Sequence, residues 1–229
     1  MFGLLIKLMA GAAVIYGALI MYPGLLLRSV SERGAFRIKS DIPLTERQLK
    51  FAGNASPRLR SAGILSSGES VEVLYFSSPG KYSFMAPYCG SSPVCVHPLK
   101  NMILIGPADL EKGTAADGGV SKELDYLLAF NTVLMKRKAS IGPVSYYTSS
   151  RWPMEGYADQ VAWADDNTRR PEDICWGNVE TDPERAMYLR RLALEHIMRE
   201  NKLLRDAVID GSFSFDVAVK ALKRTYCGG

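Results

Sequence analysis

Histidine is scarce in this sequence of 229 residues, which contains only His97 and His196. The two are not four residues apart, the spacing at which one face of a helix holds a metal ion. The four cysteines include no C-x-x-C pair, and the sequence has no internal repeat or low-complexity tract. These absences argue against the common helical and cysteine-based zinc sites and against repeat architectures.

The sequence also has no long block of like charges. Its net charge of +4 and pI near 8.8 come from Lys and Arg residues that are scattered among acids. We therefore expect no nucleic-acid partner. Hydrophobic residues make up 47% of the chain and charged residues 23%, which at this length predicts one well-cored domain.

The N-terminus differs from the rest in composition. After Lys7, residues 8–27 carry no charge, and as a helix they would extend about 30 Å at roughly 1.5 Å per residue. We predict a transmembrane anchor over residues 1–27. A cleaved signal peptide is the alternative, because Ser29, Val30 and Ser31 offer small residues at a suitable spacing.

Two features bear on the side of the membrane. Arg28, Arg33, Arg37 and Lys39 follow the apolar run, and this local charge would keep the domain in the cytoplasm. Large domains can be translocated despite such charge, and the cysteines suit an oxidising compartment. We expect a single-pass membrane protein whose domain is extracytoplasmic, on the periplasmic side.

The four cysteines, Cys89, Cys95, Cys175 and Cys227, permit two disulfides. Cys89 and Cys95 flank a short stretch of Gly, Ser and Pro, and a bond between them could close that loop. Four free thiols are the alternative.

Hydrophobic periodicity predicts strands first and helices later. Short strands are expected at residues 36–39, 71–76 and 102–105, with a long loop or a loosely formed hairpin over residues 79–98. Helices are expected to begin at Thr45 and at Ser121, and to cover residues 153–164, 181–206 and 214–226. This order favours an α+β fold.

Residues 152–159 read Trp-Pro-Met-Glu-Gly-Tyr-Ala-Asp, and they follow a predicted helix, a basic turn at residues 136–138 and Gly142. In this order of features, residues 127–159 resemble the bacterial membrane-anchored zinc metallopeptidases of the gluzincin, or peptidase MA-like, family. The resemblance implies a peptidase MA-like domain over residues 28–229, in which a small N-terminal sheet precedes a mostly helical, zincin-like half. It also implies that Glu155, the third zinc ligand in that family, points inward.

The other positions that bind zinc in that family carry different residues here. Phe130 and Leu134 stand where the family has two histidines, and Asn131 stands where it has the glutamate that acts as general base. Neither apolar side chain can bind a metal, and an amide cannot accept a proton near neutral pH. We therefore expect no catalytic residue, no metal and no cofactor, and interpret the chain as a pseudopeptidase that retains only Glu155.

Without a metal, the former site could become part of the core. Phe130 and Leu134 would then be buried, each contributing about 1.5 to 3 kcal/mol. A buried amide needs a hydrogen-bond partner, so we expect Asn131 and Glu155 to contact each other, directly or through a water.

Candidate binding residues for a peptide or protein partner are Trp152, Tyr157 and Asp159. Trp and Tyr are also common packing residues, and Asp159 could simply face water.

Two other functions are compatible with the sequence. An active hydrolase could use Glu155 together with His196 or His97 as a relocated metal or acid–base pair. A structural envelope component would need the N-terminal anchor and no functional groove.

Overall fold

The computed structural model of the chain describes residues 2–163, 171–175, 183–201, 209 and 213–228. They form an α+β fold with a mixed five-stranded sheet, which confirms the predicted class. The chain divides into two compact units, Met1–Met135 and Lys136–Gly229, which we call the first and the second unit. The division falls within helix α4 (Leu124–Ile141).

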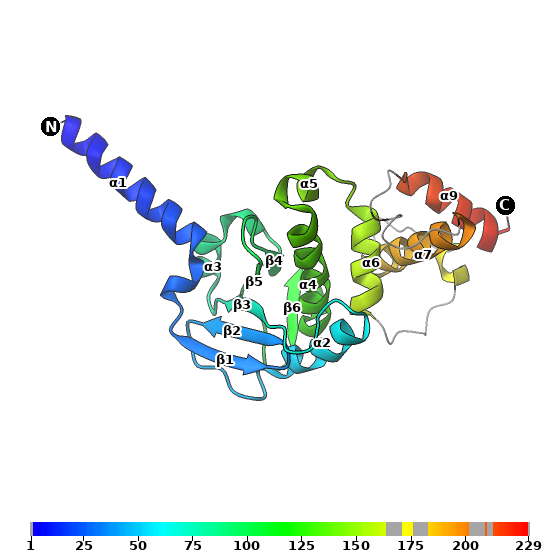
Figure 1. Cartoon of the computed structure of the whole chain (residues 1–229), viewed down its shortest axis with the longest axis horizontal. Coiled ribbons are helices and arrows are strands. Elements are labelled where there is room, and N and C mark those ends of the chain that lie inside the picture. Colours follow the sequence, from blue (N-terminus) through cyan, green and yellow to red (C-terminus); the bar gives the residue numbers. More distant parts are fainter. Residues whose placement is uncertain (1, 164–170, 176–182, 202–208, 210–212, 229) are drawn as a thin grey trace. The chain divides into compact units, whose positions relative to one another are not determined.

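The first unit is built on a sheet whose strands lie in the order β1-β2-β3-β5-β4 (Figure 1). The strands are β1 (Ser29–Arg33), β2 (Phe36–Ser40), β3 (Val71–Tyr75), β4 (Val94–Val96) and β5 (Met102–Ile105). Strands β2, β3 and β5 are parallel, whereas the edge strands β1 and β4 run antiparallel to their neighbours. The strands predicted at residues 36–39, 71–76 and 102–105 are thus the parallel centre of the sheet.

Both faces of this sheet carry buried apolar side chains, because alternate residues of a strand point to opposite faces. One face carries Ile38, Val73 and Ile103, which lie in register on the three parallel strands and are fully buried. The other face carries Leu74 and Leu104, which belong to a cluster with residues of the helix that follows β3. A parallel sheet that is covered on both sides is typically rich in Val, Ile and Leu, as here.

The helices of the first unit connect and cover these strands. They are α1 (Phe2–Met21), η1 (Pro23–Leu26), α2 (Lys50–Ser61), α3 (Pro79–Met85), η2 (Pro87–Cys89) and the first part of α4. Helix α2 joins β2 to β3, and α3, η2 and β4 join β3 to β5. A hairpin of β6 (Thr114–Asp117) and β7 (Val120–Glu123) precedes α4.

The turn between β1 and β2 is fixed to α2. Gly34 has a φ of 63°, which L side chains rarely adopt, and a Cβ at this position would lie 2.1 Å from Ser56 Oγ. Ser56 Oγ accepts a hydrogen bond of 2.8 Å from Ala35 N and donates one of 2.8 Å to Ala52 O. Because Gly34 has no Cβ, the Ser56 side chain of α2 can pack directly against the turn.

The prediction of a transmembrane anchor over residues 1–27 is wrong. Among the residues that the structure describes, no helix is both long enough and apolar enough to cross a membrane. The uncharged run is divided, since α1 ends at Met21 and η1 begins at Pro23. Pro23 is buried, and Leu27 packs in the core cluster with Leu74 and Leu104. The end of the run thus belongs to the fold of the first unit.

The prediction of a long loop or a loosely formed hairpin over residues 79–98 is also wrong, because this segment forms α3, η2 and β4. Ser78 caps α3 by accepting a hydrogen bond of 3.4 Å from Lys81 N, and Pro79 occupies the first helical position. The Ser and Pro residues act here as boundaries of short elements rather than as one continuous loop.

The helix that was predicted to begin at Ser121 begins at Leu124. Ser121 pairs with Ala116 in the β6–β7 hairpin, which turns at Gly118 and Gly119, both with positive φ. Leu124 N then donates a hydrogen bond to Gly113 O at the base of the hairpin. Pairing between the strands therefore sets the start of α4.

The helix predicted from Thr45 also begins later. Thr45 N donates to Gln48 Oε1 and Gln48 N donates to Thr45 Oγ1, as in a capping box, but residues 46–49 form a turn. Helix α2 begins at Lys50 and continues through Pro57 without interruption.

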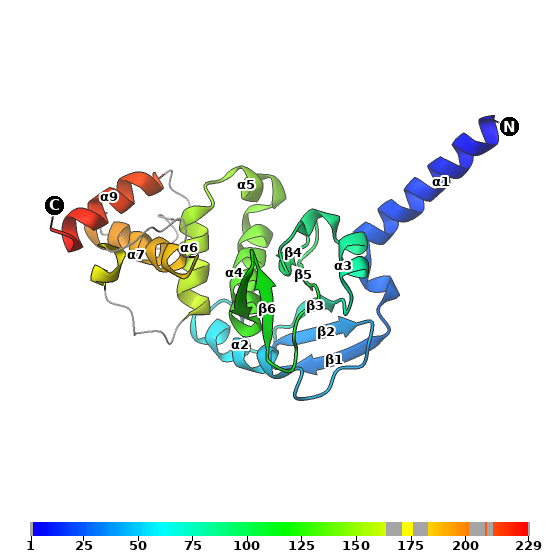
Figure 2. The same ribbon diagram turned by 180° about the vertical axis from the view of Figure 1, so that it is seen from behind.

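The second unit is helical in its described part. It contains the end of α4, α5 (Pro143–Thr148), α6 (Trp152–Ala162), η3 (Pro171–Cys175), α7 (Pro183–Asn201) and α9 (Phe215–Tyr226), which Figure 2 shows from behind. Helix α7 packs against both α6 and α9. The helices predicted at 153–164 and 214–226 correspond to α6 and α9. The one predicted at 181–206 corresponds to α7, and both its ends lie outside the described residues.

Candidate functional site

The three positions on α4 that the sequence analysis aligned with zinc-binding and catalytic residues carry two apolar side chains and one amide. Leu134 and Asn131 are buried, with 7% and 6% exposure, whereas Phe130 is half-buried and its ring lies 6.0 Å from that of Tyr126. Asn131 Nδ2 donates a hydrogen bond of 2.9 Å to Leu127 O, one turn earlier in the same helix. A backbone carbonyl of the same helix therefore satisfies one hydrogen-bond donor of the buried Asn131 amide.

Glu155 and Asp159 lie one turn apart on α6 and share a partner on α7. Arg190 Nε and Nη2 each lie 3.0 Å from Asp159 Oδ2, and Arg190 Nε lies 3.9 Å from Glu155 Oε2. The side chain of Asp159 is only 1% exposed, so its charge depends on this pairing. The two carboxylates of the candidate segment are thus compensated by one guanidinium, which the sequence analysis did not identify.

Gly156 allows the two helices to approach closely. A Cβ at this position would lie 2.8 Å from Arg190 O, a distance that real Cβ atoms essentially never show. Glycine is therefore required where the backbone of α6 passes that of α7. The Gly and the Asp of the Glu-Gly-Tyr-Ala-Asp segment consequently both serve the packing of α6 on α7.

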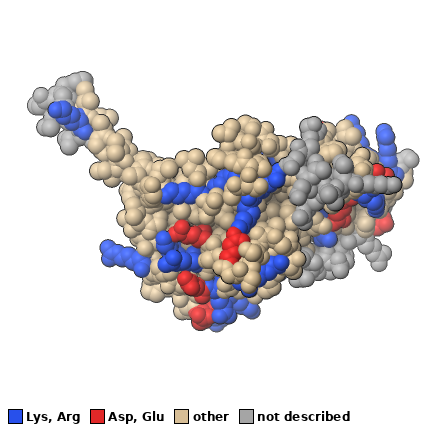
Figure 3. Space-filling model, viewed as in Figure 1, with Lys and Arg blue, Asp and Glu red and all other residues tan. Residues whose placement is uncertain are grey.

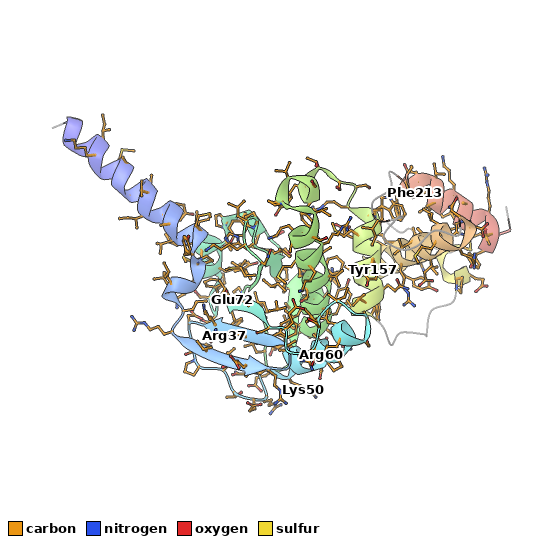
Figure 4. All side chains as sticks on the ribbon, in the orientation of Figure 1. Arg37, Lys50, Arg60, Glu72, Tyr157 and Phe213 are labelled. Atoms are coloured by element: carbon orange, nitrogen blue, oxygen red, sulfur yellow. A yellow bond between two sulfur atoms is a disulfide. The ribbon has the colours of Figure 1, made fainter. Side chains whose placement is uncertain are left out.

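Trp152 and Tyr157 pack within the second unit. Trp152 Nε1 donates a hydrogen bond of 2.7 Å to the carbonyl of Phe213, which is labelled in Figure 4. The centroid of the Trp152 ring lies 5.3 Å from that of the Phe215 ring. Tyr157, also labelled, is 7% exposed. Burial of Tyr157 and Asp159 leaves little of either side chain for a partner to touch, and their part in binding stays a prediction.

Tyr146 and Arg151 complete the surroundings of Glu155. Burial raises the pKa of Tyr146, although a hydrogen bond with Arg151 opposes the shift, and the negative charge of Glu155 raises this pKa further. The sequence analysis identified neither of these two residues. Their spacing of five residues carries no signal, because Tyr146 lies on α5 and Arg151 is the N-cap residue of α6.

His97 links the end of α1 to the rest of the first unit. Its ring is fully buried, Nε2 lies 3.2 Å from Ile20 O, and Nδ1 accepts hydrogen bonds from Leu99 N and Lys100 N. Because Nδ1 is an acceptor, Nε2 carries the proton and donates to the end of α1. Both ring nitrogens are thus engaged with backbone groups.

His196 is 9% exposed, and its Nδ1 lies 3.5 Å from Arg199 Nη2 on the same helix. A neighbouring guanidinium opposes the binding of a second cation. Within the described parts of the chain, no group of three or more His, Cys, Asp or Glu side chains could hold a metal ion.

The cysteines form two disulfides, Cys89–Cys95 and Cys175–Cys227. The first closes the loop between η2 and β4, as the sequence suggested. The second joins η3 to the end of α9 across 52 residues. Of the two possibilities left open by the sequence, two disulfides or four free thiols, the structure has the disulfides.

Asn131 belongs to the first unit and Glu155 to the second. The contact expected between them stays a prediction.

Lys138, near the end of α4, is a further buried cation. Its side chain is 2% exposed, and burial lowers its pKa from 10.5 to about 8. The unfolded chain therefore binds this proton at a higher pH than the folded chain, and folding stability rises with pH between about 8 and 10.5 by about 1.4 kcal/mol per pH unit.

We expect the free energy of unfolding of the wild type to rise with pH between about 8 and 10, and that of Lys138→Met to lack this rise, because methionine carries no proton to lose. The wild type should therefore gain stability relative to Lys138→Met as the pH approaches 10. Urea unfolding of both proteins across this pH range measures it, with the same substitution of the exposed Lys220 as the control. A difference that stays constant with pH would contradict the assignment.

Comparison with known proteins identified no relative of this chain. No protein family, no curated protein and no solved structure matches it.

Proposed function

We propose that the chain is a non-catalytic, peptide- or protein-binding relative of the peptidase MA-like zinc metallopeptidases. The observation that carries this proposal is the set of residues on α4. Phe130 and Leu134 cannot bind zinc, and Asn131 cannot act as a general base. Without these groups the folded domain cannot catalyse zinc-dependent hydrolysis, but its surface can still bind a peptide or protein.

The ion pair on α6 supports the same proposal. A carboxylate that is buried in an ion pair is less able to bind a metal or accept a proton than an accessible one without a counter-charge. Asp159 is buried against Arg190, and Glu155 lies near the same guanidinium. Arg190 thus occupies the position from which a cationic centre would act on these carboxylates.

Restoring the family residues tests the proposed relationship. The variant with Phe130→His, Asn131→Glu and Leu134→His should take up stoichiometric zinc, because histidines four residues apart share one face of α4. The wild type should take up none. Zinc bound after dialysis is measured by atomic absorption.

Two outcomes would contradict the relationship. One is a restored variant that folds, as judged by its circular dichroism, but binds no zinc. The other is stoichiometric zinc in the wild type that depends on Glu155, which would favour an active hydrolase.

Binding itself is tested with a permanently unfolded polypeptide, such as carboxymethylated lactalbumin, as the probe. The wild type should bind this probe in a fluorescence anisotropy titration and leave it uncleaved, as checked by mass spectrometry. Cleavage would indicate a hydrolase, and absence of binding would overturn the proposed binding function.

A further inference from the structure

Exposed apolar side chains surround the end of α1 in the first unit. Five of them, between 52% and 71% exposed, form a group that we call the collar, namely Tyr22, Leu25, Leu26, Phe84 and Leu99. They come from η1 and its N-cap, from α3 and from the connection between β4 and β5. Apolar surface continues along α1 itself. Exposed groupings of this kind mark interaction surfaces.

Specific contacts bring these segments together at α1. The Tyr16 ring lies 4.9 Å from that of Phe84, and its hydroxyl donates to Phe84 O. His97 joins Ile20 O to the backbone of Leu99. Figures 1 and 2 both show α3 beside the end of α1. These contacts hold the end of α1 to the segments that carry the collar.

Lys7 is the only charged residue of helix α1, and the exposed apolar side chains of the helix do not lie along one stripe. Ile6, Met9, Val14 and Ile15 are 55% to 73% exposed, and a Cβ at Gly11 would meet nothing within 4 Å. A surface helix of a soluble domain normally has one polar face. A helix that exposes apolar side chains in several directions is stabilised by apolar surroundings.

The charge around this surface has one sign. Residues 1–31 and 73–108, which supply α1 and the whole collar, contain no Asp or Glu, although the chain has 24 of them. They contain Lys7, Arg28, Lys81 and Lys100. Asp41 reaches this region but is paired with Lys81, and its side chain is only 7% exposed. In Figure 3 no acidic side chain is visible on α1 or where it joins the domain.

We propose that α1 and the collar bind the surface of an anionic lipid bilayer. The acyl chains would cover the exposed apolar side chains of α1 and the collar, and the headgroups would meet the nearby cations. Lys100, 3.2 Å from the centre of the Tyr22 ring, places a charge next to the collar. Apolar residues flanked by basic residues are typical of interfacial lipid binding. The proposal requires no crossing of the bilayer.

The first test is flotation of the full chain with vesicles of phosphatidylcholine, with or without phosphatidylserine. Binding should be tighter with phosphatidylserine and should weaken with added salt. Arg28→Gln together with Lys100→Gln should weaken binding to the anionic vesicles by roughly 5-fold per lost cation. Lys50→Gln, an exposed site on α2, is the control and should have little effect. Equal binding to both vesicles would overturn the role of charge.

The second test asks whether the collar touches lipid. Leu99→Trp should add fluorescence that shifts to the blue on vesicles and is quenched by brominated acyl chains. The control is Asn54→Trp, at an exposed position on α2, which lies away from α1 in both views of the ribbon. Its fluorescence should not be quenched.

Two results would overturn the proposal. One is a Leu99→Trp protein that floats with vesicles but is quenched no more than Asn54→Trp, which would leave the collar outside the lipid. The other is a chain that ignores vesicles and forms a concentration-dependent dimer that Leu25→Gln with Leu99→Gln dissociates. The surface would then bind a second copy of the chain.

Discussion

Removing the disulfide Cys175–Cys227 is expected to destabilise the second unit by about 4 kcal/mol, from the entropy of closing a loop of 52 residues in the unfolded chain. The disulfide secures the end of helix α9, which is otherwise held by non-covalent contacts. Helix α9 is short, and in its described surroundings it depends on buried Ala218 and Leu222 and on the contact of Phe215 with Trp152. Without the disulfide, we expect α9 to separate from η3 before the rest of the unit unfolds.

Urea unfolding of Cys175→Ser with Cys227→Ser, compared with the wild type, measures this loss. The matched control is Cys89→Ser with Cys95→Ser, where the separation of 6 residues gives only about 2 kcal/mol by the same relation. Equal losses for the two double variants, or none for the first, would contradict the expectation. Reduction of the wild-type protein should reproduce the effect of both variants together.

Asp159→Asn is expected to cost roughly 2 to 4 kcal/mol, because it leaves Arg190 partly buried without its main counter-charge. Arg190 is 24% exposed, and Glu155 lies 3.9 Å away, so part of the charge remains compensated. Both features place the effect below that of breaking a fully buried pair. The loss should appear as a lower urea midpoint with an unchanged m value.

Two controls separate this pairing from general effects of charge. Glu155→Gln should cost less than about 1 kcal/mol, because the distance to Arg190 is long and the side chain is 28% exposed. Asp216→Asn, at an exposed position in the first turn of α9, should cost less still. If Asp159→Asn proved no worse than Asp216→Asn, the proposed role of the buried pair would be wrong.

The parts of the fold that the sequence predicted are those with a strong local signal. Residues 102–105 are a continuous apolar run and residues 71–76 are interrupted only by Glu72, and such runs form the central strands of a covered sheet. The start of α6 was marked by Pro153 at a first-turn position. The short distance between Cys89 and Cys95 made their disulfide an early possibility.

The parts that it missed depend on partners that are distant or weakly marked. Strand β1 reads Ser-Val-Ser-Glu-Arg and is recognisable only through its pairing with β2. Ser121 was predicted to begin a helix, but it pairs with Ala116 in the β6–β7 hairpin. The transmembrane prediction counted all of residues 8–27 as one element, although the last of them, Leu27, is in the core.

At the candidate site, the sequence identified the carboxylates but not the residue that neutralises them. Arg190 lies 31 residues after Asp159, and no local spacing links the two. The need for Gly156 likewise arises from the backbone of another helix. Features of this kind become visible only when the packing of α6 on α7 is known.

The hydroxyl of Ser56 has a consequence for how the first unit assembles. It joins the β1–β2 turn to α2 across 21 residues, so the outer hairpin lacks a full set of partners until α2 has wound. A two-stranded hairpin is only marginally stable alone in water. The β1–β2 turn and α2 are therefore coupled through one side chain, and loss of the Ser56 hydroxyl should loosen both.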